Sequence, residues 1–262
     1  MKITIIGAGN MGGAIARGLT YGNMIKAENI TVTAATSKSL DIMKEFNPAI
    51  HTTTDNRQAI KDADIIMIAV KPWLIDHIAG ELKPVIDIRK QIIVSIVAGV
   101  PFSHLTDLFK DKNTTPSLYR VIPNTAISIR ESMTAIAAFN TTEEQDKLII
   151  DIFNELGKSV LIEERLMTAA TALCSCGTAF ALRYIRAAME GGIELGLYAE
   201  QAREIVAQTV KGAAGLLLQN KTHPEAEIDK VTTPGGITIK GLNEMEEAGF
   251  TTAVIKGLKA AK

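Results

Sequence analysis

The sequence has 262 residues, is 47% hydrophobic and 22% charged, and carries a formal net charge of −1. This composition is typical of a globular protein with one large domain or two ordinary ones, and it argues against a nucleic-acid or anionic-membrane partner. Cys174 and Cys176 are too close for an ordinary disulfide and too few for a metal cage, so we expect no metal site. The apolar run before Gly7 is too short for a signal peptide or a membrane span, and we expect a cytoplasmic protein.

A glycine-rich turn follows the first apolar run. Ile3 to Ile6 is β-branched and predicts a buried parallel strand, and the stretch G-A-G-N-M-G comes directly after it and leads into helical spacing. Gly7 allows a tight turn, Gly9 leaves room for a pyrophosphate, and Gly12 lets the helix pack close to the strand. A turn that binds nothing is the alternative. The motif predicts a dinucleotide site made by Gly7, Gly9, Asn10, Met11 and Gly12.

Apolar runs that alternate with amphipathic stretches continue along the first half of the chain. They predict strands at residues 30–35, 50–53, 64–70, 91–98 and 119–123, and helices at residues 38–46, 75–86 and 101–109. Two further segments, 132–139 and 159–162, are expected as edge strands around a helix at 142–156. Strands separated by helices predict the α/β class, with an N-terminal Rossmann-type, doubly wound, mostly parallel sheet over residues 1–163.

The end of the second strand indicates the cofactor. An NAD site usually has an Asp or Glu there for the ribose 2′-hydroxyl. The stretch V-T-A-A-T-S-K, residues 32–38, has no carboxylate and instead offers hydroxyls and one cation, from Thr33, Thr36, Ser37 and Lys38. These groups suit a 2′-phosphate, so we expect NADPH, with NADH possible. A solvated turn with a helix N-cap at Ser37 is an alternative that is compatible with either cofactor.

Three strand ends are candidate ligand positions, because ligands bind at the carboxyl ends of the strands in such a sheet. They are Lys71-Pro72, Ala98-Gly99 and Pro123-Asn124. Lys71 could equally be a solvated loop lysine, and Asn124 a turn residue. The four histidines are scattered, with no partner that would indicate a nucleophilic or metal site. The chemistry is therefore expected to be hydride transfer by the cofactor, oriented by the protein.

The second half of the chain is helical and rich in small residues. Helical periodicity runs from Leu166 to about Gln219, with many Ala and Gly residues that let helix backbones approach closely. This pattern predicts a C-terminal all-α dimerisation domain over residues 164–262. Arg183 and Glu190 interrupt the apolar stretch, which argues against a membrane span. Cys174 and Cys176 are expected to be small buried residues, with a metal or redox role as the alternative.

Five motifs in order along the chain resemble one family. They are I-I-G-A-G-N-M-G at the N-terminus, A-V-K-P at 69–72, P-N-T at 123–125, E-G-G-I-E-L-G-L at 190–197, and T-T-P-G-G-I-T at 232–238 with E-A-G-F at 247–250. The first is generic to dinucleotide folds and the last is specific. Together they resemble pyrroline-5-carboxylate reductase across essentially the whole chain. A Pro-Gly-Gly break between two long helices is the bland interpretation of the last motif.

The resemblance implies the reduction of 1-pyrroline-5-carboxylate to L-proline, the last step of proline biosynthesis, by a homodimer and a possible decamer. It implies that the loop at 232–238 faces the nicotinamide in a site shared across the dimer, where backbone amides bind the substrate carboxylate. Thr238 is the implied catalytic residue, with its hydroxyl on the ring nitrogen. The other implied substrate residues are Thr233, Gly235, Gly236, Ile237, Asn124 and Thr178. The implied cofactor residues beyond the glycine turn are Asn56, Ala69, Val70, Lys71, Pro72, Ala98 and Asn124.

One segment departs from the family pattern. Where the family has S-G-S-G-P-A-Y, this chain has C-S-C-G-T-A-F at residues 174–180. Thr178 replaces a proline and Phe180 replaces a tyrosine, which removes an apolar ring contact and a hydrogen-bonding group. These changes keep two alternatives open: a paralogous reductase of another cyclic imine or small substrate, and a catalytically decayed nucleotide-binding paralogue.

Overall fold

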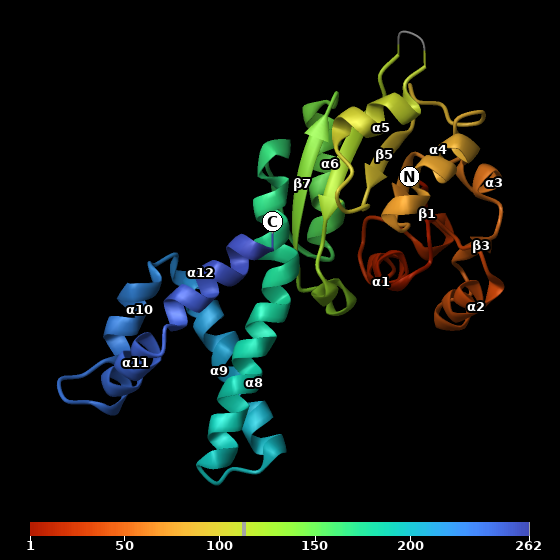
Figure 1. Ribbon diagram of the computed structural model, residues 1–262. Coiled ribbons are helices and arrows are strands. Elements are labelled where there is room, and N and C mark those ends of the chain that lie inside the picture. Colours follow the sequence, from red (N-terminus) through yellow and green to blue (C-terminus); the bar gives the residue numbers. More distant parts are fainter. Residues whose placement is uncertain (112–113, 262) are drawn as a thin grey trace. The chain divides into compact units, whose positions relative to one another are not determined.

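The computed structural model describes residues 1–111 and 114–261, and these form two compact units, Met1–Ser175 and Cys176–Lys262 (Figure 1). Contacts group residues 164–175 with the first unit, whereas the sequence pattern places them in the second domain. The boundary after residue 163 stays a prediction. The boundary between the two compact units lies later, after Ser175.

The first unit contains an eight-stranded sheet in the order β3-β2-β1-β4-β5-β6-β7-β8 (Figure 1). All neighbouring strands pair in parallel except β6 and β7. The predicted doubly wound, mostly parallel sheet is confirmed. The strands are β1 (Ile3–Ile6), β2 (Ile30–Thr33), β3 (His51–Thr53), β4 (Ile65–Ile68), β5 (Ile92–Ser95), β6 (Leu118–Ile122), β7 (Ser132–Phe139) and β8 (Gly157–Leu161).

The central strands β1, β4 and β5 are buried throughout and mostly apolar, because helices cover both faces of the sheet. Ile3 and Ile5 of β1 belong to one core cluster and Ile6 to the other, as the two-residue repeat of a strand requires. The first cluster includes apolar residues of α1 (Asn10–Leu19), α2 (Ser37–Phe46) and α6 (Glu143–Asn154). The second includes residues of α3 (Asn56–Ile60), α4 (Ile75–Leu82), α5 (Phe102–Phe109) and α7 (Met167–Ala170).

Two expectations about this unit need correction, and one helix was not expected. β7 was expected at an edge, but it lies inside the sheet between β6 and β8, and its residues Thr134 to Ala137 are buried. The helix expected at 75–86 ends at Leu82, because Pro84 cannot continue it. The short helix α3 was missed, since five residues are too few to show a period.

The second unit is entirely helical over its described residues. It comprises α8 (Gly177–Glu194), α9 (Ala199–Asn220), α10 (Pro224–Val231), α11 (Ile237–Glu247) and α12 (Phe250–Ala260). The expected helical stretch from 166 to 219 is interrupted by a π-helix at Thr171–Cys176 and by a turn at Gly196, which has a φ of 101°. α8 and α9 pack against each other along this unit.

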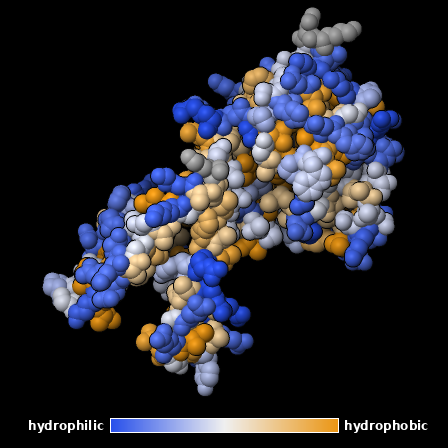
Figure 2. Space-filling view, viewed as in Figure 1, coloured by the Kyte–Doolittle hydropathy of each residue, from blue (hydrophilic) through white to orange (hydrophobic). Residues whose placement is uncertain are grey.

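Most apolar side chains of the helical unit are exposed. Among its described residues only Ala202 is buried, while Leu195 is 89% exposed, Tyr198 81% and Leu218 74%. Figure 2 shows hydrophobic residues, in orange, among polar ones on the surface of the molecule. By length and composition alone the stretch Glu164–Glu194 could cross a membrane, and 11% of its apolar window is buried within the chain. An apolar surface of this extent indicates that the helical unit binds a partner surface.

Candidate active site

The glycine turn between β1 and α1 has the form expected of a phosphate-binding turn. Gly7 has a φ of 108°, and a Cβ there would lie 2.6 Å from the Ala69 carbonyl oxygen. A Cβ on Gly12 would collide with the carbonyl of Gly7, whereas one on Gly9 would meet nothing within 4 Å. Gly7 and Gly12 are therefore required by the fold. Gly9 leaves open space beside bare backbone, where a pyrophosphate can approach.

The first turn of α1 can hold a negative charge. Its N-cap is Gly9, no side chain caps the helix, and the first turn has no acidic residue. Asn10 is exposed and Met11 half-buried at the start of the helix. Because unpaired backbone amides and the helix dipole both favour anions, this end of α1 suits the pyrophosphate of a dinucleotide.

The turn after β2 has no carboxylate, as its sequence shows. Thr36 is the N-cap of α2 without a side-chain hydrogen bond, Ser37 and Lys38 are exposed, and the first turn has no acidic residue. Thr33 differs from the expectation that its hydroxyl faces the ligand. It is 1% exposed and donates its hydroxyl hydrogen to Asn56 Oδ1 over 2.6 Å. The exposed groups at 36–38 fit a 2′-phosphate, whereas the Thr33 side chain bonds within the protein.

The sheet brings the predicted strand-end residues to one edge. β1, β4, β5 and β6 are consecutive neighbours, so their carboxyl ends lie side by side. The Ala69 amide donates to Ile6 O over 2.8 Å, which joins the end of β4 to the glycine turn. Half-buried Val70 follows Ala69, and exposed Lys71 precedes a 3₁₀ turn at Pro72–Leu74. Ala98 is exposed beyond the end of β5.

The loop at 232–238 lies in the helical unit between α10 and α11. These helices have 8 and 11 residues, so the loop does not separate two long helices as expected. Gly235 has a φ of 72°, and the Gly236 amide donates to Thr233 O over 2.9 Å. Gly236 is the N-cap of α11, with no side-chain cap and no acid in the first turn, and Ile237 and Thr238 are exposed. The loop therefore presents backbone amides and one threonine hydroxyl at a helix N-terminus.

Comparisons with known proteins identify the family. The family model described as pyrroline-5-carboxylate reductase dimerisation matches residues 164–262, and that described as NADP oxidoreductase coenzyme F420-dependent matches residues 2–99. Pyrroline-5-carboxylate reductase 2 of Dictyostelium discoideum is 40% identical over 98% of this chain and 89% of its own length. The chain belongs to the pyrroline-5-carboxylate reductase family. Its dimerisation model covers the helical unit, which supports oligomerisation through the exposed apolar surface described above.

Other members of the pyrroline-5-carboxylate reductase family agree with this assignment. Pyrroline-5-carboxylate reductase 1 of Dictyostelium discoideum is also 40% identical over 98% of the chain, which spans 48% of that relative's length. The solved structure of a pyrroline-5-carboxylate reductase from Coxiella burnetii has a TM-score of 0.90 and 31% identity, and covers 99% of this chain and 95% of its own. The pyrroline carboxylate reductase of Plasmodium falciparum, solved with NADP bound, has a TM-score of 0.87 and 28% identity, and covers 100% and 95%. The predicted fold, family and oxidoreductase class are confirmed.

The segment that departs from the pyrroline-5-carboxylate reductase pattern begins in a π-helix. This π-helix, Thr171–Cys176, was not expected from the sequence, whose helical spacing shows no interruption there. Asn124 at the end of β6 holds it in place. Asn124 is 8% exposed, its Nδ2 donates to Cys174 O over 2.9 Å, and its Oδ1 accepts from the Ala126 amide over 3.0 Å. Its amide group serves the protein's own backbone, so the structure gives Asn124 a positioning role at the strand end.

The cysteines and Thr178 occupy the same segment. Cys174 and Cys176 carry thiols rather than a disulfide and are half-buried, so the expectation that both are buried is wrong. Burial raises the pKa of the Cys174 thiol, which keeps it protonated and poorly nucleophilic near neutral pH. Thr178 is half-buried in the first turn of α8, and Phe180 is 39% exposed. Across residues 1–111 and 114–261, no group of three or more His, Cys, Asp or Glu side chains could hold a metal ion.

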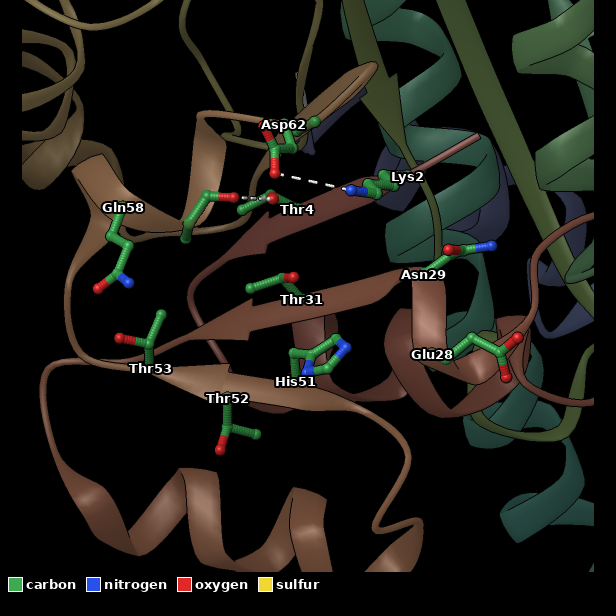
Figure 3. Close-up of a pocket in the computed structure, with 12 residues that line it drawn as sticks. Lys2, Thr4, Glu28, Asn29, Thr31, His51, Thr52, Thr53, Gln58 and Asp62 are labelled. Atoms are coloured by element: carbon green, nitrogen blue, oxygen red, sulfur yellow. Dashed lines mark hydrogen bonds and ion pairs between the residues drawn. The ribbon is translucent and has the colours of Figure 1, made fainter.

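A cavity of about 470 Å³ lies along β1, β2 and β3, next to α3 (Figure 3). Its lining includes Lys2 before β1, Asn29 before β2, the three residues of β3 (His51–Thr53), and Gln58 and Ala59 of α3. Lys2 Nζ pairs with Asp62 Oδ2 at 3.6 Å, and Thr4 donates to Ala59 O at 2.7 Å. None of the residues that line the cavity is a candidate site residue, so the cavity is separate from the candidate active site.

Proposed function

We propose that this chain reduces 1-pyrroline-5-carboxylate to L-proline with NADPH, the last step of proline biosynthesis. The observation that carries the proposal is the loop at 232–238, where a helix N-terminus without a side-chain cap adjoins the exposed Thr238. A small anion with an adjacent polar ring atom fits such a loop. Membership of the pyrroline-5-carboxylate reductase family supports the same substrate.

The residues of the first unit fit an NADP-type dinucleotide. The open space beside Gly9 and the first turn of α1 suit the pyrophosphate, and exposed Ser37 and Lys38 suit a 2′-phosphate. NADPH supplies the hydride when bound. Lys71, Pro72 and Ala98 are assigned to the walls of the nicotinamide end, since they follow β4 and β5 at the same edge. NADH stays an alternative reductant with lower affinity, because it would leave the groups at 36–38 without a phosphate.

The helical unit is assigned the substrate. The backbone amides of Gly235, Ile237 and Thr238 bind the carboxylate, and the Thr238 hydroxyl oxygen accepts a hydrogen bond from the protonated ring nitrogen. A protonated imine is already electrophilic at the carbon that takes the hydride, so the protein needs no general acid at that step. The ring C=N becomes a C–N single bond, and the nitrogen keeps its proton. Thr233 shapes the loop through its carbonyl, which accepts from the Gly236 amide.

We infer that two copies associate through their helical units and that such dimers assemble into a decamer in the cytoplasm. The exposure of Leu195, Tyr198 and Leu218 supports the first step, because a stable unit does not leave so much apolar surface in water. The decamer rests on the family resemblance. Sedimentation of the purified chain distinguishes monomer, dimer and decamer directly.

The test is NADPH oxidation followed by absorbance, with 1-pyrroline-5-carboxylate as substrate. Thr238→Ala should lower kcat/KM roughly 10- to 100-fold, the effect of losing one hydrogen bond to a charged group. Thr251→Ala removes a threonine hydroxyl from α12 and serves as the matched control, with kcat/KM within about twofold of the parent. If Thr238→Ala were as active as the parent, the Thr238 hydroxyl would have no role in the reaction.

Because residues 174–180 depart from the family pattern, the second experiment varies the ring size of the imine substrate. Thr178 and Phe180 are the changed side chains of the segment that opens α8. A six-membered cyclic imine carboxylate is therefore assayed beside the five-membered substrate. A higher kcat/KM for the larger ring would assign the chain to another cyclic imine. Binding of NADP⁺ without turnover of either ring would indicate a decayed paralogue.

A further inference from the structure

We propose that Glu81 of α4 is a positioning residue of the dinucleotide site: it fixes the orientation of the Asn56 side-chain amide and thereby sets the affinity of the chain for the adenosine end of the dinucleotide. The inference depends on the proposed function in one respect, namely that the chain binds an NADP-type dinucleotide. The imine substrate plays no part in it.

A continuous run of hydrogen bonds leads from the glycine turn to Glu81. The amides of Gly7 and Ala8 donate to the Thr33 carbonyl over 3.0 and 2.8 Å. The Thr33 hydroxyl donates to Asn56 Oδ1 over 2.6 Å, and Asn56 Nδ2 donates to Glu81 Oε2 over 2.7 Å. Every member of the run belongs to the first unit. The phosphate-binding turn and Glu81 are thus joined through two side chains.

Asn56 lies where a dinucleotide places its adenosine ribose. Thr33 is the last residue of β2, and the end of this strand lies near the ribose 2′ group in this fold. Asn56 begins α3, two residues beyond the end of β3, and β3 is the parallel neighbour of β2. Asn56 is half-buried at this end of the sheet. An amide there can donate to a ribose hydroxyl or to a phosphate oxygen.

Glu81 decides which way that amide points. An ionised carboxylate only accepts hydrogen bonds, so it requires the Nδ2 end of Asn56. The Thr33 hydroxyl alone could donate to Oδ1 or accept from Nδ2, and would therefore allow both orientations. The Asn56 amide nitrogen carries two hydrogens, and Glu81 takes one. The other points in a direction that Glu81 has set, which lowers the entropy cost of binding a ligand there.

Contacts within α3 and α4 hold Glu81 itself. His77 Nε2 lies 3.1 Å from Glu81 Oε1, and Arg57 Nε donates to the Glu81 backbone carbonyl over 3.1 Å. The Glu81 side chain is 32% exposed and that of His77 70% exposed. The exposed His77 pair contributes little, so the Asn56 bond is the main role of this carboxylate.

A competing role for Glu81 is direct charge repulsion of a 2′-phosphate. Removing Glu81 would then strengthen NADP⁺ binding, whether or not Asn56 is present. The positioning role has the opposite sign and requires Asn56. A double-mutant cycle on the dissociation constant of NADP⁺ separates the two, because a residue that acts through another loses its effect when that other residue is absent.

The experiment measures the dissociation constant of NADP⁺ by calorimetry for the parent, Glu81→Ala, Asn56→Ala and the double variant. Introduced into the parent, Glu81→Ala should raise the dissociation constant of NADP⁺ about tenfold. Introduced into Asn56→Ala, the same change should raise it less than about twofold. Glu81→Gln can donate as well as accept, so it no longer selects one orientation of the Asn56 amide and should recover only part of the affinity. Asp76→Ala is the matched control, because it removes an α4 carboxylate that pairs with His104, and should change binding less than about twofold.

Either of two results would overturn the proposal: unchanged or stronger binding by Glu81→Ala, or an equal effect of Glu81→Ala in both backgrounds. Far-ultraviolet circular dichroism and the melting temperature confirm that each variant is folded. Should Glu81→Ala fail to fold, the same cycle is run with Glu81→Leu, which keeps the side-chain volume and removes both oxygens. No imine is present in these titrations, so a failed substrate assignment leaves the result intact.

Discussion

The side-chain amide of Asn124 donates to the backbone carbonyl of Cys174 over 2.9 Å and so ties the end of β6 to a π-helix. The same amide accepts from Ala126 N, and the Asn124 backbone amide donates to Ser132 Oγ over 3.1 Å. A π-helix is less stable than an α-helix and persists where neighbouring groups hold it. Asn124 therefore fixes the first residues of the segment in which this chain departs from its family.

Replacing Asn124 with aspartate should destabilise the first unit. The Asn124→Asp variant would lose the donor to Cys174 O and place a carboxylate against a carbonyl at an 8% exposed position. We expect the free energy of unfolding to fall by about 1–3 kcal/mol, measured by urea denaturation. Asn47→Asp is the control, because Asn47 uses only Oδ1, to accept from Ala49 N, and an aspartate keeps that bond. If Asn124→Asp and Asn47→Asp were equally stable, the hydrogen bond from Asn124 to Cys174 would not stabilise the fold.

Gly9 and Gly12 should respond differently to the same substitution. Gly9→Ala meets open space in the protein, so the fold should survive while NADP⁺ binding weakens more than about tenfold. Gly12→Ala collides with the Gly7 carbonyl and should lower both stability and binding. Melting temperature and calorimetry measure the two effects. Gly80→Ala in α4 also meets open space and should leave binding unchanged. Tight NADP⁺ binding by Gly9→Ala would exclude the glycine turn as the pyrophosphate site.

Tyr119 should make the protein sensitive to alkaline pH. It is fully buried, and its hydroxyl donates to Asp146 Oδ1 over 2.7 Å. Burial, with the Asp146 hydrogen bond, raises the pKa of the Tyr119 phenol in the folded state. Its stabilising effect is therefore complete below the unfolded pKa of about 10, and above that pH the free energy of unfolding should fall by about 1.4 kcal/mol per pH unit.

Denaturation of Tyr119→Phe from pH 8 to 11 tests this expectation. The variant should be less stable than the parent by about 1–2 kcal/mol at pH 8, and its stability should fall less steeply above pH 10. Tyr21→Phe, which alters a 62% exposed tyrosine, is the control and should keep the parent's pH dependence. Parallel pH profiles for the parent and Tyr119→Phe would show that other groups cause the alkaline loss.

A charge on the apolar surface of the helical unit should weaken self-association. Leu218 of α9 is 74% exposed, and Leu218→Glu would place a carboxylate in a contact between copies. Sedimentation velocity should show a shift toward monomer at micromolar concentration. Ile129→Glu alters a 71% exposed isoleucine of the first unit and should leave the assembly unchanged. Dissociation by both variants, or by neither, would argue against the helical unit as the main contact.

Much of the fold could be predicted because its signals are local. The run Ile3 to Ile6, the glycine turn and the helix after it are each specified by neighbouring residues, and the structure has all three. The position of β7 inside the sheet could not be predicted, because it depends on which strands pair. α3 is too short for a period, and the π-helix at Thr171–Cys176 keeps ordinary helical spacing in its sequence.

The sequence by itself determined the family, the order of strands and helices, and the residue types of the candidate site, because those depend on short motifs such as G-A-G-N-M-G and T-T-P-G-G-I-T. Only the tertiary structure decided the partners of the polar side chains. Asn56 meets Glu81 25 residues later, and Asn124 meets Cys174 50 residues later. No local pattern encodes such pairs, because a hydrogen bond depends on atoms within about 3 Å in the folded chain rather than on distance along it.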